Sequence, residues 1–231
     1  MSHRIFVAFD QTQWSAVETL GRQLQGSGAG AKVGLELYSA HGPRSVEFLA
    51  SLGLPVFLDL KLHDIPNTVQ RALRSFLRLP IDLVNVHAAG GQAMLEAAAE
   101  ALVLERSAAR LIAVTQLTST SEAEMQRDQG ITSSLQESVL RYARLAHRAG
   151  LAGVVCSAQE ARLVKDATAT SFLCVTPGIR LAAGPSHDQK RIMTPAAAIA
   201  NGADYLVVGR AITEARDPHA SLLALLKELP A

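Results

Sequence analysis

Apolar and polar positions follow two different periods along the chain, and the two alternate from one end to the other. Short runs rich in β-branched and aliphatic residues indicate strands, and longer segments with apolar residues every three to four positions indicate helices. The strand candidates are almost entirely apolar, which is typical of parallel strands covered on both faces. They lie at Ile5–Phe9, 31–37, 56–60, 82–86, 111–114, Gly153–Val155, 172–175 and Tyr205–Val208.

A helix candidate follows each strand candidate. The expected helices are Trp14–Leu24, 44–52, one that begins near Pro66, 91–106, 135–149, 158–165, 195–201 and 222–228, and a polar stretch at 119–132 precedes the fifth of them. Repeated βα units with right-handed crossovers can close into a ring. We therefore predict an α/β fold, a (β/α)8 TIM barrel that forms a single domain over residues 1–231, with a doubly wound open sheet as the alternative.

Composition narrows the class of protein. Of 231 residues, 48% are hydrophobic and 19% are charged, which favours an ordinary globular chain over a disordered one. The net charge of +1 argues against a general nucleic-acid or membrane-surface binder, although a local anion site remains compatible with it. The chain contains no run of about 18 uncharged apolar residues, so the sequence predicts no membrane span.

The two cysteines and the first residues bear on location. Cys156 and Cys174 are isolated, so they predict buried thiols rather than a disulfide framework. The chain passes directly into a strand-like run at Ile5, without the layout of a signal peptide. We expect a cytoplasmic protein.

Polar residues gather where the strand candidates end. In a TIM barrel, the working groups lie at the carboxyl ends of the strands and in the loops that follow. The residues at or near those places are Asp10, Asp59, Lys61, Asp64, His87, Thr118, Arg180, Gly209 and Arg210, and the second strand candidate carries Lys32 near its start. His87 could line a site there, or it could be a hydrogen-bonded histidine of the core.

The segment after the third strand carries the strongest signal. Asp59 and Lys61 are two residues apart, so on a regular strand both side chains point to the same face. Such a pair inside an apolar barrel is costly unless it is paired or used in chemistry. Asp64 adds a second carboxylate three residues beyond the lysine. The alternative is a solvated salt bridge at the end of the strand.

The last strand predicts an anion site. It ends in Gly209 and Arg210, just before a further apolar segment. A glycine N–H, the start of a helix and an arginine fork together can bind a phosphate group. TIM barrels often hold phosphate after their seventh and eighth strands. The alternative is a glycine turn with an exposed arginine.

Two other patterns give little support for a functional site. Residues 26–31 fit the letters of a dinucleotide fingerprint, but a helix precedes them and a strand follows, which is the reverse of that motif. We interpret them as a connection between a helix and a strand. The histidines show no paired metal-binding spacing such as H-E-x-x-H, so we expect no metal site.

Residues 56–69 (VFLDLKLHDIPNTV) resemble the signature segment of the orotidine 5′-phosphate decarboxylase family. Further segments resemble other strands of that family, from the first to the last: 6–10, 32–34, 85–91, 113–119, 176–180, 188–191 and 207–212. The Asp-x-Lys-x-x-Asp element is shared by a wider superfamily of barrels, whereas the whole set is specific to this family and is most similar to its bacterial stand-alone form. One departure is Ser186-His187-Asp188, where an acidic pair is more usual.

The resemblance implies an activity: cofactor-free decarboxylation of orotidine 5′-monophosphate to uridine 5′-monophosphate in de novo pyrimidine biosynthesis. It implies that Lys61 donates a proton to C6 of the pyrimidine. It also implies an alternating charge array made of Lys32, Asp59, Lys61 and Asp64.

The resemblance further implies how the substrate is bound. Asp10, with Lys32 nearby, would contact the ribose, and Thr118 would contact the substrate near a subunit interface. The implied phosphate ligands are Arg180, Gln189, Gly209 and Arg210. The protein would be a homodimer in which Asp64, Ile65 and Thr68 complete the neighbouring subunit's site.

Two other functions are compatible with the Asp-x-Lys-x-x-Asp element. One is a relative such as 3-keto-L-gulonate 6-phosphate decarboxylase, which acts on a sugar phosphate through a Mg²⁺-stabilised enediolate and would lose its activity in EDTA. The other is a nucleotide-binding barrel without turnover. The intact lysine and both carboxylates argue against the second.

Overall fold

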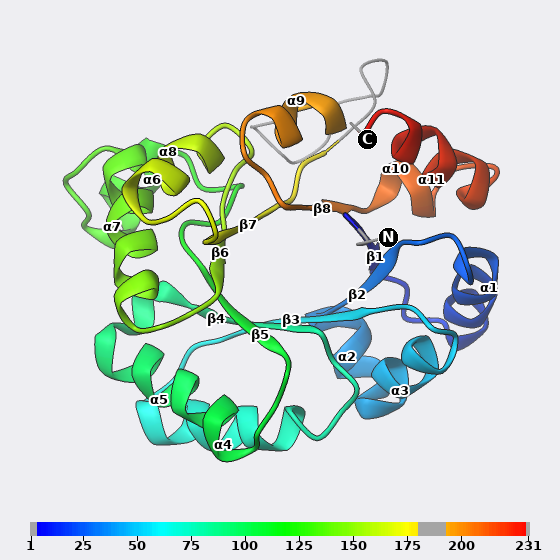
Figure 1. The fold of residues 1–231 in the computed structure, drawn as a ribbon, viewed down its shortest axis with the longest axis horizontal. Coiled ribbons are helices and arrows are strands. Elements are labelled where there is room, and N and C mark those ends of the chain that lie inside the picture. The colour runs from blue at the N-terminus through cyan, green and yellow to red at the C-terminus, as the bar shows by residue number, and fades with distance from the viewer. Residues whose placement is uncertain (1–3, 180–192, 230–231) are drawn as a thin grey trace.

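A computed structural model describes residues 4–179 and 193–229, and its strands form a closed barrel in chain order from β1 to β8 (Figure 1). All neighbouring strands are parallel, and pairing between β1 and β8 closes the ring. The strands are β1 Ile5–Phe9, β2 Gly30–Gly34, β3 Val56–Leu62, β4 Leu83–His87, β5 Arg110–Val114, β6 Gly153–Val155, β7 Leu173–Thr176 and β8 Tyr205–Val208. The predicted TIM barrel is confirmed, and the doubly wound open sheet is wrong because it would leave its edge strands unpaired.

The helices form a ring outside the barrel (Figure 1). They are α1 Trp14–Leu24, α2 Leu35–His41, α3 Pro43–Ser51, α4 Pro66–Phe76, α5 Gln92–Leu104, α6 Glu122–Gln129, α7 Leu135–Arg148, α8 Ala161–Ala167, α9 Pro195–Ala200, α10 Arg210–Thr213 and α11 Pro218–Lys227, with a short 3₁₀ turn η1 Ala88–Gly90. No helix among the described residues is long and apolar enough to cross a membrane.

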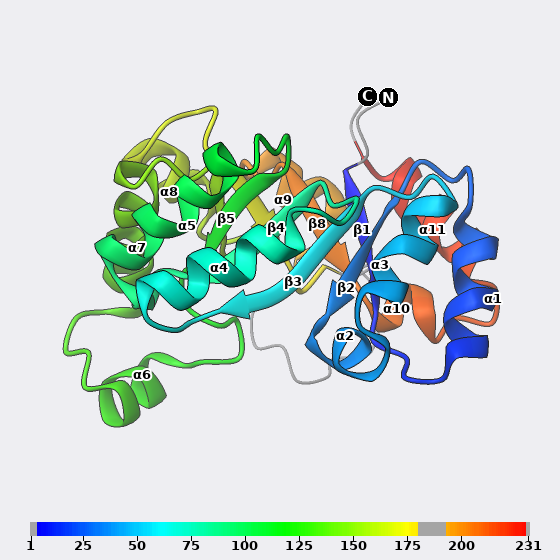
Figure 2. The same cartoon turned by 90° about the horizontal axis from the view of Figure 1, so that it is seen from below.

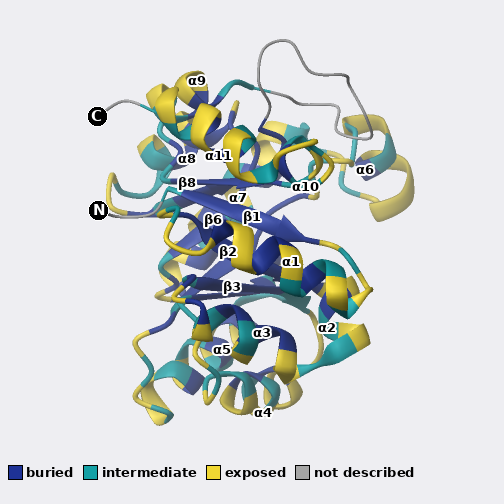
Figure 3. Cartoon of the chain, turned by 90° about the vertical axis from the view of Figure 1, so that its right-hand side faces the viewer, coloured by how far each residue is buried: buried dark blue, intermediate teal, exposed yellow. Residues whose placement is uncertain are grey.

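Alternation along each strand divides the core into two layers. Residues that face outward, such as Val7 and Val84, pack with the inner faces of the helices, and the outer helix faces are exposed (Figure 3). The inward residues form a separate buried cluster inside the barrel: Phe6, Ala8, Phe57, Leu83, Ile112, Val175, Tyr205 and Val207. Two-sided burial explains why the strands are apolar at nearly every position.

Aromatic side chains fill the amino end of the barrel. The Phe6 ring lies 5.7 Å from Phe57 and 5.6 Å from Tyr205, measured between ring centroids. Arg110, at the start of β5, donates from Nη1 to the Tyr205 hydroxyl at 2.7 Å. Because this end is packed, polar chemistry is left to the carboxyl end, from which α6 projects away from the barrel (Figure 2).

Two predicted boundaries are wrong. The strand expected at 31–37 ends at Gly34, and the next residues begin α2. The error arose because Leu35 and Leu37 continue the apolar run, although Leu37 is buried as part of a helix. The polar stretch at 119–132 contains α6, of which Met125 is the buried residue.

Other expectations hold. The segment at 25–29 connects α1 to β2 without forming a phosphate-binding loop between a strand and a helix. Cys156 and Cys174 are both free and buried.

Candidate active site

A cavity of about 610 Å³ opens at the carboxyl end of the barrel. That volume is in the usual range for a small-molecule site. Its floor is the apolar interior of the barrel, and its polar groups come from strand ends and the loops beyond them. The lining residues are Ala8, Asp10, Lys32, Phe57, Asp59, Lys61, Val114, Gln116, Leu117, Thr118, Val155, Pro177, Gly178, Ile179, Val207, Gly209, Arg210, Ala211, Glu214 and Ala215.

A charged array lies against one wall of this cavity. Asp59 is its centre: Oδ1 lies 2.7 Å from Lys61 Nζ, and Oδ2 lies 3.3 Å from Lys32 Nζ. Lys32 Nζ also lies 3.5 Å from Asp10 Oδ1. Asp59 is only 7% exposed and Lys32 only 8%, whereas the Lys61 side chain is 35% exposed where it lines the cavity, so the Asp59–Lys61 pair is buried on its carboxylate side only.

The charge state of Asp59 follows from competing effects. Burial by itself raises the pKa of this carboxyl, but the charges of Lys32 and Lys61, with hydrogen bonds from Lys61 and Asn85, lower the pKa below its usual value. Asp59 is therefore an anion at neutral pH despite its burial. A buried carboxylate fixed in this way can exert a strong field on a group bound beside it.

The backbone of β3 departs from a regular strand where it supplies the array. Lys61 has φ 52°, in the left-handed region that non-glycine residues rarely adopt. The register with β4 shifts between Leu58 and Leu62. The prediction that Asp59 and Lys61 share a face therefore gives the right contact for an incomplete reason, because an irregularity, and not simple alternation, brings the ammonium group to the carboxylate.

Asn85 and Gln116 are polar residues of the site region for which no role was predicted. The Asn85 amide is buried behind the array and bonds both Asp59 and Lys61. Gln116 lines the cavity and donates to Gln129 in α6 and to Ser138 in α7. Inward alternation along β4 from Leu83 could have marked position 85, but its partners are distant in sequence.

His87 lies beside the array and does not line the cavity. Its ring stacks at a tilt on His63, with centroids 5.6 Å apart. Burial lowers the pKa of His87, and the charges of His63 and Lys61 lower it further, against a smaller opposing effect of Asp59. His87 is half-buried and is absent from the cavity lining, so the ligand-lining alternative is not supported.

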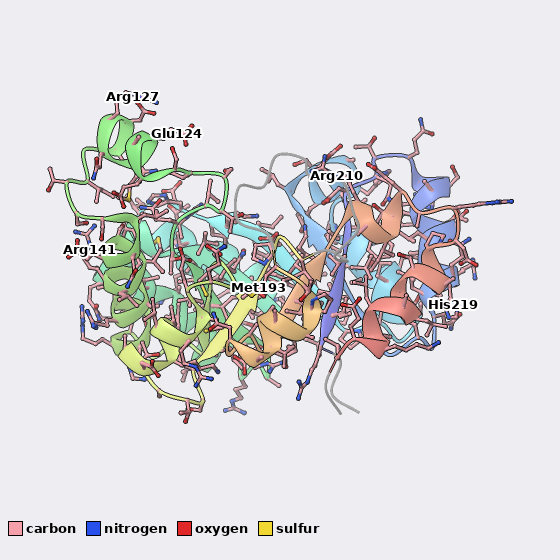
Figure 4. All side chains as sticks on the ribbon, turned by 90° about the horizontal axis from the view of Figure 1, so that it is seen from above. Glu124, Arg127, Arg141, Met193, Arg210 and His219 are labelled. Carbon is pink, nitrogen blue, oxygen red and sulfur yellow. The ribbon has the colours of Figure 1, made fainter. Side chains whose placement is uncertain are left out.

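The predicted anion site lies at the rim of the same cavity. Gly209 precedes α10, and both Gly209 and Arg210 line the cavity. Thr118 lies on the rim formed by the loop after β5. Arg210 is at the same end of the barrel as Glu124 and Arg127 of α6 (Figure 4). Arg180, Gln189 and the segment Ser186-His187-Asp188 lie outside the described residues.

The structure does not bring Asp64, Ile65 and Thr68 into this cavity. All three are exposed on the segment where β3 passes into α4. Asp64 Oδ1 accepts a hydrogen bond from the Ile65 N–H at 2.6 Å. These residues therefore lie on the outer surface of their own chain and not in its cavity.

No group of three or more histidine, cysteine, aspartate or glutamate side chains in residues 4–179 and 193–229 is arranged to hold a metal ion. Within the array, Asp59 Oδ1 accepts from Lys61 and Asn85, and Oδ2 forms an ion pair with Lys32. The carboxylate is balanced by the chain's own lysines.

Comparison with known proteins agrees with this geometry. The sequence model of the "Orotidine 5'-phosphate decarboxylase / HUMPS family" matches residues 3–225. The chain belongs to this family. A curated family member named orotidine 5′-phosphate decarboxylase, from Streptococcus pneumoniae serotype 19F (strain G54), is 54% identical over 227 residues, which are 98% of this chain and 96% of the relative.

Two crystal structures extend the match to three dimensions. An orotidine 5′-phosphate decarboxylase from Lactobacillus acidophilus has a TM-score of 0.87 and 35% identity, covering 99% of this chain and 100% of that one. An uncharacterized conserved protein from Geobacillus kaustophilus also has a TM-score of 0.87, with 44% identity over 98% of this chain and 100% of that one. The chain is thus an enzyme, a carboxy-lyase of the orotidine 5′-phosphate decarboxylase family.

Proposed function

We propose that this enzyme decarboxylates orotidine 5′-monophosphate to uridine 5′-monophosphate, without a cofactor, as a step of pyrimidine biosynthesis in the cytoplasm. The observation that carries the proposal is the array Lys32–Asp59–Lys61 on a cavity whose rim also carries Arg210. A ligand with an acidic pyrimidine at one end and a phosphate at the other matches that distribution of charge.

The chemical step needs a proton donor. When the bond between C6 and the carboxyl carbon breaks, CO₂ leaves and the electron pair stays in an sp² orbital of C6, which the ring cannot delocalise. The Lys61 ammonium group donates its proton to that pair, so the new C6–H bond forms as the N–H bond breaks. The neutral amine then regains a proton from solvent. Catalysis of this kind depends on electrostatics and positioning.

Asp59 acts on the carboxylate that leaves. Its anionic state, supported by the lowered pKa, puts a negative charge beside the substrate carboxylate and disfavours that group in the ground state. The charge disappears from the substrate carboxyl as CO₂ forms, so the repulsion is relieved in the transition state. Lys32 keeps Asp59 in place and reaches Asp10, which would hold the ribose hydroxyls.

Phosphate binding would occur at the rim. Gly209 offers a backbone N–H, and Arg210 offers a guanidinium fork that suits phosphate oxygens. Arg180 and Gln189 are expected to complete this site, and Thr118 to contact the substrate on the other side. Binding energy from the remote phosphate would help to close the site and exclude water.

The site is proposed to be completed by a second copy of the chain. Asp64, Ile65 and Thr68 are exposed and lie away from their own cavity, as residues that serve a neighbour would. Apolar side chains that follow the ends of β2, β3 and β5 are also exposed: Leu35 at 65%, Ile65 at 66% and Leu117 at 42%. An exposed apolar surface around the mouth of the barrel favours a homodimer through that face.

Lys61→Ala tests the proton-donor role. We expect turnover of orotidine monophosphate, followed by ultraviolet absorbance, to be abolished because no other ammonium group lies as close to Asp59 among the described residues. Tm should stay close to that of the parent, and exposed Lys227→Ala serves as the control. Substantial decarboxylation by Lys61→Ala would reject the role, and loss of activity in EDTA would favour the Mg²⁺-dependent alternative.

A further inference from the structure

Asn85 is the one residue of β4 that faces the irregular part of β3. Along the β3–β4 ladder, Leu58 pairs with Val84 and Leu62 pairs with Val86, so residues 59–61 stand opposite position 85 alone. Two extra residues are thus accommodated in β3 at the place where the array is built. Backbone pairing is interrupted there, and a side chain takes over.

The Asn85 side chain uses both ends of its amide. Oδ1 accepts a hydrogen bond from the Lys61 backbone N–H at 2.8 Å, and Nδ2 donates to Asp59 Oδ1 at 2.7 Å. The residue is 0% exposed, so both bonds are made without competition from water. The same oxygen of Asp59 also accepts from Lys61 Nζ.

These two bonds act on different features of the array. The first holds the backbone of Lys61 at φ 52°, a conformation that a lysine does not adopt without support. The second fixes the rotation of the Asp59 carboxylate, so that Oδ1 faces Lys61 while Oδ2 faces Lys32. Asn85 does not line the cavity, so any effect on the reaction passes through its two partners.

We propose that Asn85 is a positioning residue, whose buried amide holds the Lys61 ammonium group and the Asp59 carboxylate in the relative position that proton transfer needs. The chemistry of the side chain fits this role closely. A leucine would leave the Lys61 N–H and an Asp59 oxygen without this partner, and an aspartate would accept from Lys61 but repel Asp59. The proposal rests on the proposed role of Lys61 as proton donor.

Asn85→Ala is compared with Val84→Ala on the same strand. Both side chains are completely buried, but Val84 belongs to the apolar cluster that the barrel shares with the helices. We expect kcat of Asn85→Ala to fall about 100-fold, as a misplaced reacting group does, with KM changed far less. Val84→Ala should lose stability while keeping its kcat. Equal kcat values in the two folded variants would overturn the proposal.

Asn85→Asp adds a test that leaves no void in the core, because the new side chain has nearly the same size. The introduced carboxyl has nearly the shape of the amide and can still accept from the Lys61 N–H. Ionised, it repels Asp59; protonated, it can donate to Asp59 as the amide does. We therefore expect the ratio of its kcat to that of the parent to rise as pH falls from about 8 to about 5. A ratio that does not change with pH would contradict the proposal.

The outcomes separate this inference from the function on which it rests. If Lys61→Ala retains turnover, the proton-donor role fails whatever the Asn85 variants do. If Lys61→Ala is inactive while Asn85→Ala keeps the parent's kcat, the function stands and the positioning role is rejected. Binding of uridine monophosphate, measured by calorimetry, should change little in Asn85→Asp, because the proposed ribose and phosphate contacts lie elsewhere.

Discussion

At the scale of single residues, Gly34 shows how tightly the array is enclosed. Its φ of −89° suits any residue, so conformation does not demand glycine there. A Cβ at that position would lie 2.8 Å from Lys32 Nζ and 3.3 Å from Asp10 Oδ1. The ammonium group of Lys32 therefore occupies the space that a side chain at position 34 would need.

We predict that Gly34→Ala reduces kcat on the order of 10- to 100-fold by displacing Lys32 from Asp59. The same displacement weakens a buried ion pair, so we also expect a loss of stability of roughly 1–3 kcal/mol, although the backbone itself is unstrained. Steady-state kinetics and thermal unfolding measure the two effects separately. An unchanged kcat would mean that the position of Lys32 is not critical.

His87 gives a prediction for pH. Burial first, and then nearby positive charge, lower the pKa of His87 in the folded protein, so the unfolded chain takes up this proton at a higher pH. The stability that neutral His87 contributes is fully present above its unfolded pKa of about 6.5 and is lost as pH falls through its folded pKa.

His87→Gln should accordingly make Tm less sensitive to pH between about 7 and about 5 than it is in the parent. Exposed His219→Gln on α11 is the control and should leave the slope of Tm against pH as it was. The same slope in all three proteins would show that His87 does not carry the effect. Calorimetric scans at a series of pH values provide the comparison.

At the scale of elements, the sequence predicted the strands and helices whose apolar residues follow a clear local pattern. Apolar runs marked the eight strands, and Asp10 could be placed at the carboxyl end of the barrel from its position on the first strand. Lys32 was expected near the start of its strand, but it lies in the middle of β2 and lines the cavity. The helix α2 was missed because its buried Leu37 continues the apolar run of β2. The helix α6 was missed because only Met125 of its residues is buried, which leaves little periodicity.

The part of the site that could not be predicted depends on contacts between distant segments. The left-handed conformation of Lys61 arises where β3 and β4 fall out of register, and no local pattern encodes a shift between two strands. Asn85 bonds residues 24 and 26 positions away, so its role becomes visible only when the barrel is closed.

The junction of β8 and α10 provides a prediction at this scale. Arg210 begins α10 at the cavity rim, whereas Arg216 is exposed and does not line the cavity. We expect Arg210→Ala to lower kcat/KM for orotidine monophosphate about 10- to 100-fold, the effect of losing hydrogen bonds to a charged group. Arg216→Ala should leave it unchanged. With orotidine, which lacks the phosphate, the two variants should behave alike, and a loss with that compound as well would reject phosphate recognition by Arg210.

At the scale of the whole molecule, the barrel separates stability from chemistry along its axis. Its amino end is closed by Phe6, Phe57 and Tyr205, while the buried Asp59 and Lys32 lie on the cavity at the carboxyl end. The carboxyl end also carries the exposed Asp64, which does not reach the cavity of its own chain. A second copy that meets this end would have its cavity supplied with that carboxylate.

Mixing two inactive variants tests this arrangement. Lys61→Ala and Asp64→Asn each spoil both sites of their own homodimer, but a mixed dimer has one site with native Lys61 and native Asp64. Random exchange of equal amounts makes half of all dimers mixed, so activity should return to about a quarter of the parent's. Lys61→Ala mixed with Lys32→Ala is the matched control: both residues lie within 3.3 Å of the same Asp59, so no exchange can restore a site. No recovery in the test mixture, once exchange is verified by mass spectrometry, would show that each chain forms its site alone. Recovery in the control would show that the returned activity does not depend on Asp64 crossing between subunits.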